Sequence, residues 1–291
     1  MKEQEKSTSI AVAEVNRPAL DALREKLLLK SYSRHTRRTY CCEFTQLLYL
    51  LNTHPVNSLT PERLKDYFLY CTENLNMSEA HMQSRINAVK FYFEQVLGRE
   101  KMFVEIPRPK TPQLLPKHIS RRDVKKMFSA VDNKKHALLL KLCYGMGLRV
   151  SEIVNLKITD IDSGNMQVLI ARAKGKKDRY VNLPESILED LRNYYRAYRP
   201  KKYLFEGQNG GKYSIRSAQN VFRQAMKKAG INKAVGIHGL RHSFATHLLE
   251  KGTDIGYIQQ LLGHNDVKTT MLYAKVAQKN LRKIKSPLDE L

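Results

Sequence analysis

The chain has 291 residues, with 51 lysines and arginines against 28 aspartates and glutamates, a formal net charge of +23. A surplus of this size favours a polyanionic partner, because a basic surface gains affinity for DNA by releasing condensed counterions. The charge fits a ribosomal or other general nucleic-acid binder equally well, so it indicates the class of partner and leaves the activity open. The length allows two domains of ordinary size.

The cysteines and the start of the chain exclude several classes of protein. The four cysteines show no CxxC spacing, which favours buried free thiols in a reducing, cytoplasmic compartment over a zinc site or a disulfide framework. Residues 1–15 are charged and contain no apolar h-region, and Lys141 interrupts the apolar run 137–148. We therefore expect a flexible N-terminus over residues 1–15, no signal peptide and no membrane span.

A helical pattern without a convincing strand predicts a small helical domain over residues 16–104. A Thr-Pro pair at 60–61 is typical of a helix start, and a further helix is expected to begin at Ser78 and to stop near Gly98. The apolar positions of the expected helix faces are Tyr40, Phe44, Leu47, Leu48 and Leu51, then Leu64, Tyr67, Phe68 and Cys71, then Met82, Ile86, Val89, Phe93 and Val96.

The solvent faces expected for this domain are rich in basic and polar side chains. Such side chains can reach phosphates and base edges in a DNA groove. The candidates for DNA contact are Arg37, Arg38, Arg85 and Lys90. For each of them alone, an ordinary solvated helix face is an equally good explanation.

Residues 105–117 carry four prolines among basic side chains, a composition that favours an extended interdomain linker. A second domain, residues 118–291, is expected to begin with a capping box at Ser120 to Asp123. We expect helices near 135–146, 151–156, 184–198 and 214–229, two short strands at 167–173 and 179–183, and helices from residue 238 onward. The predicted fold class is mainly α, with a small β-hairpin or sheet in the C-terminal domain.

One short stretch near the C-terminus gathers side chains suited to phosphodiester chemistry. His238 and Arg241 are followed by His264 and Tyr273. A tyrosine can attack phosphorus, and an arginine fork can hold the phosphate oxygens. An isolated HxxR occurs by chance in many proteins, and a lone tyrosine on a helix is more often a packing residue. The combination is what favours a functional interpretation.

Three segments carry a resemblance to a known family. The run from His238 to Leu249, the segment Leu261 to His264, and Tyr273 resemble the second conserved box of the tyrosine recombinases, also called phage integrases. Residues 145–156 resemble the first box, and the hairpin 173–179 is similar to the loop that holds the catalytic lysine. The motifs occur in the family's order, and the resemblance covers essentially the whole chain. It implies a two-domain architecture that clamps DNA, with residues 16–104 as the core-DNA-binding domain and 118–291 as the catalytic domain.

The resemblance also implies a role for each signature residue. Tyr273 would attack a DNA phosphate and form a 3′-phosphotyrosyl bond, and His238 is the imidazole available for its proton. Because the unperturbed phenol pKa is about 10, a base or a positive field must assist. Arg149 and Arg241 would hold the non-bridging oxygens, and His264 would donate a further hydrogen bond.

The remaining assignments leave alternatives open. By the family's pattern, Lys174 would protonate the departing 5′-oxygen, with Lys176 as the rival on the same hairpin. Lys176 and Lys177 would contact DNA phosphates in either case. Arg149 could instead form an ordinary ion pair with Glu152, which we expect to orient the site.

The predicted function is site-specific recombination of double-stranded DNA by a homotetramer on two sites, with the tail after Tyr273 exchanged between protomers. Xer-like and integron-integrase-like members are both considered. We expect no metal and no cofactor, because a phosphotyrosyl bond conserves the phosphodiester energy and no two-metal or P-loop motif presents itself. The alternatives are DNA relaxation of the type IB topoisomerase kind and a non-catalytic DNA-binding or architectural factor. The target sequence and the choice between integration, inversion and resolution stay open.

Overall fold

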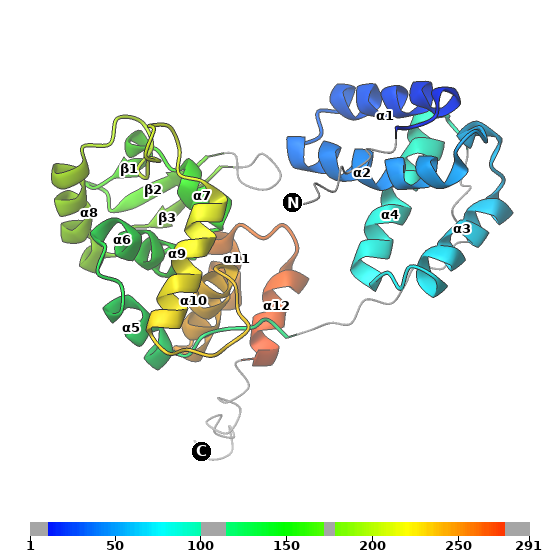
Figure 1. Cartoon of the computed structure of the whole chain (residues 1–291). Coiled ribbons are helices and arrows are strands. Elements are labelled where there is room, and N and C mark those ends of the chain that lie inside the picture. Colours follow the sequence, from blue (N-terminus) through cyan, green and yellow to red (C-terminus); the bar gives the residue numbers. More distant parts are fainter. Residues whose placement is uncertain (1–10, 100–114, 172–177, 277–291) are drawn as a thin grey trace, which may run out of the picture. The chain divides into compact units, whose positions relative to one another are not determined.

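The computed structural model describes residues 11–99, 115–171 and 178–276, and it divides the chain into two compact units, Met1–Gln113 and Leu114–Leu291. Figure 1 shows the helices and strands of both units. The predicted fold class is confirmed, since the described residues are mainly helical with a small antiparallel sheet in the C-terminal unit. None of the helices in these ranges is long and apolar enough to cross a membrane.

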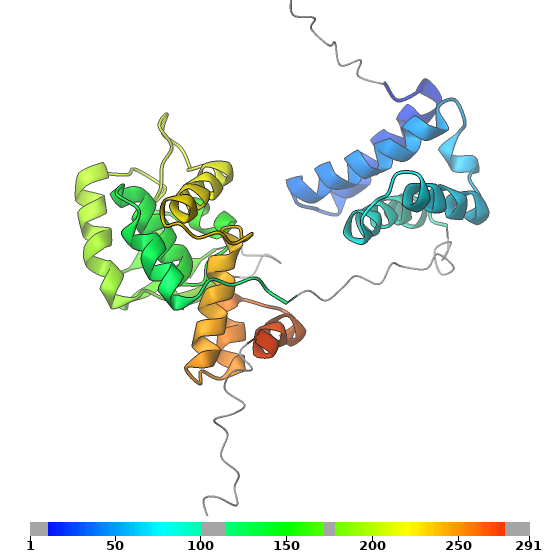
Figure 2. The same ribbon diagram turned by 60° about the horizontal axis from the view of Figure 1, so that its bottom comes forward.

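The N-terminal unit is an all-helical bundle over its described residues. Its elements are η1 (Glu14–Asn16), α1 (Arg17–Leu29), α2 (Arg34–Leu51), η2 (Val56–Ser58), α3 (Pro61–Glu73), α4 (Glu79–Phe91) and η3 (Tyr92–Val96). Helices α2 and α3 begin where side-chain oxygens of Ser33 and Thr60 accept hydrogen bonds from backbone amides in the first turn. Helix α2 runs alongside α1 and packs on α4 (Figure 2). The predicted apolar faces supply most of the buried core, including Phe44, Leu64 and Phe93.

Arg85 corrects one prediction for this unit. It was expected on a solvent face, but only 5% of it is exposed, because α4 turns it inward. Its Nε donates to Glu43 Oε2 at 2.8 Å, and its Nη1 lies 3.3 Å from the Tyr67 hydroxyl. His81 contacts the other carboxylate oxygen at 3.0 Å. Arg85 is therefore part of a buried polar network that joins α2, α3 and α4.

We expect Arg85→Ala to lower the free energy of unfolding by about 3 kcal/mol, because it leaves the largely buried carboxylate of Glu43 without its main partner. Urea denaturation of the full chain would measure this. Arg38→Ala is the matched control, since Arg38 is exposed and its loss should change stability by less than about 0.5 kcal/mol. If Arg85→Ala were as stable as wild type but bound DNA weakly, Arg85 would be a DNA contact, as predicted from the sequence.

The C-terminal unit contains the sheet and the remaining helices. Its elements are α5 (Arg121–Ser129), α6 (Lys134–Gly145), α7 (Val150–Asn155), η4 (Ile158–Asp160), β1 (Ile161–Asp162), β2 (Gln167–Ile170), β3 (Arg179–Asn182), α8 (Glu185–Tyr198), α9 (Ile215–Lys228), α10 (His238–Glu250), α11 (Ile255–Leu262) and α12 (Val267–Val276). Of the predicted capping box at Ser120 to Asp123, the N-cap bond is present, since the Ser120 hydroxyl accepts from the Asp123 amide at 3.2 Å.

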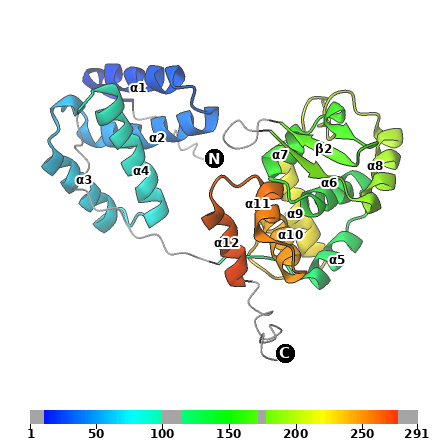
Figure 3. The same cartoon turned by 180° about the vertical axis from the view of Figure 1, so that it is seen from behind.

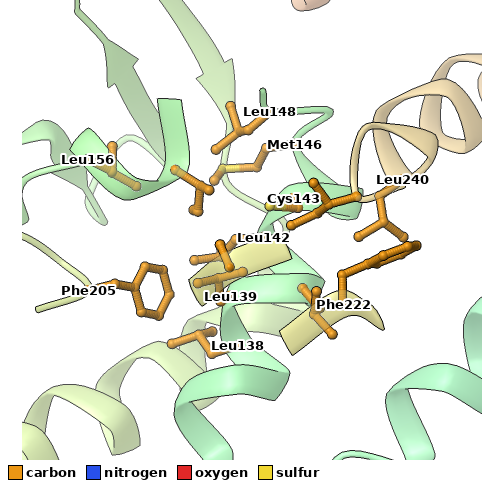
Figure 4. Close-up of a cluster of buried hydrophobic side chains, with 14 of the residues drawn as sticks. Leu138, Leu139, Leu142, Cys143, Met146, Leu148, Leu156, Phe205, Phe222 and Leu240 are labelled. Carbon is orange, nitrogen blue, oxygen red and sulfur yellow. The ribbon is translucent and has the colours of Figure 1, made fainter. Parts of the chain in front are cut away.

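The sheet is antiparallel with the order β1-β2-β3, and Val168 pairs with Ile161 on one side and with Val181 on the other. The two strands of the predicted hairpin are confirmed as β2 and β3. Strand β1 was not predicted, because two residues are too few to show an alternating pattern. Helix α6 is central, in contact with α5, α7, α8, α9 and α10 (Figure 1). Its buried face, with Leu138, Leu139 and Leu142, meets Phe205 and Phe222 in the main core (Figure 4).

Helices α10, α11 and α12 lie side by side against this core (Figure 3). Ala245, Ile258, Leu262 and Tyr273 form a separate small apolar cluster among them. Helix α11 ends at Gly263, whose φ of +62° is the left-handed conformation that closes many helices. The chain therefore delivers His264 immediately after α11 and Tyr273 on α12 to the same side of α10.

Candidate active site

Arg241 is the buried centre of the candidate site. Only 1% of it is exposed, on the inner face of α10. Its Nη1 donates to the carbonyl of Gly147 at 2.8 Å, and its Nη2 donates to the carbonyl of Leu262. Gly147 has a φ of +60° in the turn between α6 and α7, where a Cβ would lie 2.5 Å from the ring of Phe244. The guanidinium thus holds together the turn before α7 and the end of α11.

Arg149 and Glu152 form the second part of the site, at the start of α7. The Arg149 amide donates to Glu152 Oε2 at 2.8 Å, and Arg149 Nη1 donates to Oε1 at 2.7 Å. Arg149 Nη2 reaches the Gly263 carbonyl at 3.5 Å. The ion pair weighed as an alternative for Arg149 is therefore present, and it places the guanidinium beside Arg241 rather than withdrawing it from the site.

A third guanidinium, Arg179 at the start of β3, was not foreseen from the sequence. Its two terminal nitrogens donate to the two oxygens of Glu152 at 2.9 and 2.8 Å, and its Nε donates to the Leu261 carbonyl at 2.9 Å. Arg241 Nη1 also lies 3.7 Å from Glu152 Oε2. A single buried carboxylate therefore contacts three guanidiniums.

The electrostatics follow from this count of charges. Burial opposes ionisation of Glu152, but the hydrogen bonds and charges of Arg179 and Arg149 outweigh it and lower its pKa to about 2. Burial, then the charge of Arg149, lowers the pKa of Arg241 to about 9, which leaves it charged at neutral pH. Three positive groups against one carboxylate leave a net positive charge in a low-dielectric site. Such a site attracts an anion strongly.

Tyr273 lies on α12 with 2% of its surface exposed. Its hydroxyl is 2.9 Å from Nδ1 of His242, a residue that the sequence reasoning did not single out. Burial raises the pKa of Tyr273, and the charges of Arg241 and Arg149 lower it in part. The ring of His264 is stacked on that of Tyr273, with centroids 6.2 Å apart, and His264 Nδ1 is 2.9 Å from the Thr270 hydroxyl oxygen.

His238 stands at the first turn of α10 and is exposed. Partial burial of its ring, followed by the charges of Arg241 and Arg149, lowers the pKa of His238. Its ring meets that of His242 edge to face, with centroids 4.6 Å apart. Residues 238 and 242 are four apart on a helix and so share a face. That spacing is the sequence signal by which His242 could have been found.

The structure thus brings together six predicted residues, namely Arg149, Glu152, His238, Arg241, His264 and Tyr273. The hairpin lysines Lys174, Lys176 and Lys177 lie outside the described residues. In the N-terminal unit Arg38 is exposed, Arg37 is half-buried with its Nε buried and without a hydrogen-bond partner, and Lys90 is 3.3 Å from Glu94. Within the described ranges no three histidine, cysteine or acidic side chains are placed to hold a metal ion.

The buried histidines predict that the fold is sensitive to acid. Burial is the main cause that lowers the pKa values of His242, His247 and His264 to about 4. Between pH 6.5 and 4 these histidines bind protons in the unfolded chain but not in the folded chain. Their contribution to the free energy of unfolding is therefore fully present above pH 6.5 and is lost as the pH falls toward 4. Each histidine contributes at most about 1.4 kcal/mol per pH unit, and the partly exposed His242 and His264 contribute less.

We therefore expect the melting temperature of the full chain to fall by about 5–10 °C between pH 7 and pH 5. Calorimetry across that range would measure it. Glu152, with a pKa of about 2, lowers the stability of the fold only below pH 4.5. The range from pH 7 to pH 5 therefore reports on the histidines without a contribution from Glu152. A melting temperature that stays constant from pH 7 to pH 5 would contradict the prediction.

Comparison with known proteins places this geometry in a family. Residues 117–280 match the phage integrase family, and residues 19–101 match the N-terminal SAM-like domain of phage integrases. The chain belongs to the phage integrase family. The resemblance predicted from the sequence is confirmed, and it covers both units of this integrase.

The integrase has close relatives over nearly its full length. It is 36% identical over 279 residues to the putative integrase/recombinase y4qK of Sinorhizobium fredii, a match that covers 94% of this chain and 89% of the relative. It is 35% identical over 272 residues to the tyrosine recombinase XerA of Pyrococcus horikoshii, with 92% of each chain covered. These relatives identify the integrase as a tyrosine-type site-specific recombinase.

Solved structures of recombinases are similar in fold to this chain, among them XerA and XerH. The crystal structure of XerA recombinase has a TM-score of 0.55 and 28% identity, and the match covers 94% of this chain and 100% of that one. XerH bound to palindromic difH substrate in a post-cleavage complex has a TM-score of 0.71 and 19% identity, with 97% and 98% covered. At that identity, the likeness to XerH shows the fold alone.

Proposed function

We propose that this recombinase breaks and rejoins DNA strands with Tyr273 as the nucleophile. The observation that carries the proposal is a buried phenol beside a net positive cluster built from Arg149, Arg179 and Arg241 around Glu152. The phenol oxygen attacks the phosphorus, a bond to the 3′-phosphate forms, and the 5′-oxygen departs. The energy of the phosphodiester is kept in the phosphotyrosyl bond, so the step calls for neither nucleotide nor metal.

Arg149 and Arg241 hold the non-bridging oxygens of the phosphate. Both guanidiniums are held by carbonyls and by Glu152, so they meet the charge that grows on those oxygens without rearranging. His264 donates to the same phosphate, with Thr270 holding its other ring nitrogen. His238, exposed on the first turn of α10, donates a further hydrogen bond to the phosphate. Glu152 orients the guanidiniums.

Lys174 is proposed as the general acid for the leaving 5′-oxygen, with Lys176 as the rival, and Lys176 and Lys177 as phosphate contacts. Arg179 supports this assignment indirectly. It ties the start of β3, the strand that follows the lysine hairpin, to Glu152 and to α11. A hairpin anchored at that end can present a lysine to the phosphate that the arginines hold.

The substrate is double-stranded DNA with a specific site, and Arg37, Arg38 and Lys90 are the proposed DNA contacts of the N-terminal unit. XerH is described as bound to its difH substrate, and lambda integrase, with a TM-score of 0.70 and 16% identity, as a tetramer on a Holliday junction. We extend both properties to this chain as a homotetramer on two sites in the cytoplasm, with the tail after α12 exchanged between protomers. The basic charge supports DNA as the partner.

A two-site plasmid tests the proposal. The bound sequence is first mapped by footprinting on genomic fragments, and two copies are then placed in direct or inverted orientation. Deletion products from direct repeats and inversion products from inverted repeats are expected. Relaxation of supercoils without either product would favour the type IB topoisomerase alternative, and binding without any strand breakage would favour an architectural factor.

A further inference from the structure

The phenol of Tyr273 has a partner, His242, that lies within the second conserved box but has no role assigned from the sequence. Its hydroxyl lies 2.9 Å from Nδ1 of His242, within hydrogen-bond distance, and the tyrosine is only 2% exposed. Water therefore has little access to the phenol oxygen. Among the described residues, His242 is the group placed to receive a proton from that oxygen.

The protonation state of His242 suits this task. Burial, followed by electrostatic repulsion from His238 and Arg241, lowers the pKa of His242 to about 4, so the ring is neutral at pH 7. A neutral imidazole has one nitrogen that carries a proton and one that accepts. With the proton on Nε2, Nδ1 accepts the hydrogen bond from the phenol.

The other histidines of the site are placed for different contacts. His264 stacks its ring face on Tyr273, and its Nδ1 is occupied by the Thr270 hydroxyl. His238 lies next to His242, with ring centroids 4.6 Å apart and edge to face. The arginines of the site are permanent cations and can only donate.

We propose that His242 is a catalytic residue of the integrase and serves as the general base for Tyr273. This rests on the proposed function of Tyr273 as the nucleophile. As the phenol oxygen forms its bond to phosphorus, its proton moves to Nδ1 of His242, and the bond from phosphorus to the 5′-oxygen breaks with a proton supplied by the general acid. In the rejoining step the 5′-hydroxyl attacks phosphorus and gives its proton back to the same general acid, while His242 returns its own proton to the departing phenol oxygen.

The charges balance through this sequence. The imidazolium that forms on His242 lies beside a phosphate whose negative charge is growing, so the two charges stabilise each other. Proton transfer to a positioned base within hydrogen-bond reach typically contributes about 10²–10⁴-fold to a rate. We therefore expect the loss of His242 to slow cleavage by about 10²–10³-fold while DNA affinity stays the same.

The same helix supplies a matched control. His247, also on α10, lies 2.9 Å through its Nδ1 from the hydroxyl of Tyr144, a second histidine and tyrosine pair away from the phosphate site. Its pKa is likewise lowered to about 4. His247→Gln removes a comparable pair, so it reports the cost of losing such a contact without touching the nucleophile.

The test is single-turnover cleavage of a nicked suicide duplex by the full chain, with His242→Gln, His242→Gly and His247→Gln. Glutamine can still accept the phenol's hydrogen bond but cannot take its proton, so His242→Gln is expected to be slow and His247→Gln to remain within about threefold of wild type. Added imidazoles are expected to restore His242→Gly, and the more basic ones to restore it faster. A purely structural role of His242 would not produce that dependence.

A second substrate distinguishes deprotonation of the phenol from protonation of the leaving 5′-oxygen. When sulfur replaces the bridging 5′-oxygen, the leaving group needs no acid, so the defect of His242→Gln is expected to persist. A His242→Gln rate near that of wild type, rescue by the sulfur substrate, or no response of His242→Gly to imidazoles would each overturn the proposal. If the wild type forms no covalent adduct, the proposed function itself fails, and the two failures are thereby distinguished.

Discussion

Tyr273→Phe is expected to abolish covalent capture of a nicked duplex, with a loss of more than about 10⁴-fold that leaves no adduct resistant to SDS. The substitution removes only the oxygen that would attack phosphorus. The ring remains, buried among the apolar side chains of α10 and α11 and stacked on His264. Adduct formation is measured on denaturing gels after mixing the protein with labelled suicide substrate.

Tyr273→Phe is expected to destabilise the fold only slightly, so a loss of adduct formation can be assigned to the missing nucleophile. Tyr273→Phe gives up one hydrogen bond to His242, worth about 1 kcal/mol. DNA affinity should therefore stay within about twofold of wild type. Tyr144→Phe is the control, because it removes the hydroxyl of the other histidine and tyrosine pair on α10. An adduct formed by Tyr273→Phe would show that another residue is the nucleophile.

Glu152→Gln is expected to lower the free energy of unfolding by about 3–5 kcal/mol and to reduce cleavage as well. The carboxylate contacts Arg149, Arg179 and Arg241, and an amide cannot offset three buried positive charges. An amide also presents two donors toward guanidiniums that only donate. We expect the arginines to move apart, which misplaces the phosphate oxygens that they hold.

Denaturant titration of the full chain and single-turnover cleavage together measure this prediction. Asp190→Asn is the control, because Asp190 pairs with Lys141 at 2.5 Å on a surface where both side chains remain substantially exposed. Such a pair contributes about 0–1 kcal/mol. If Glu152→Gln were no more destabilising than Asp190→Asn, the three guanidiniums would have to be balanced by another group, and Glu152 would not orient the site.

Local patterns accounted for most elements of secondary structure. The predicted helix starts at Thr60 and Ser120 depend on a side chain and an amide three residues apart. Apolar faces repeat every three to four residues, so they can be recognised within a short window. The same short range explains why β1, with two residues, escaped prediction.

The burial of Arg85 shows where such patterns fail. Along α4, periodicity alone does not decide whether an arginine faces water or the carboxylate of Glu43, which is 42 positions away. Only the packing of α2 on α4 brings the two together. The same limit applies to Arg179 and Glu152, which are 27 positions apart and joined by two hydrogen bonds.

The sequence by itself determined the two-domain length, the basic character, the order of the motifs and the identity of the signature residues. These depend on residue types and on spacing along the chain. Only the tertiary structure decided that Glu152 contacts three guanidiniums, that Arg85 is buried and that Nδ1 of His242 lies within hydrogen-bond distance of the Tyr273 hydroxyl. Those contacts form between distant segments, because the burial of apolar faces brings α7, β3, α10 and α12 together, and no local preference specifies that arrangement.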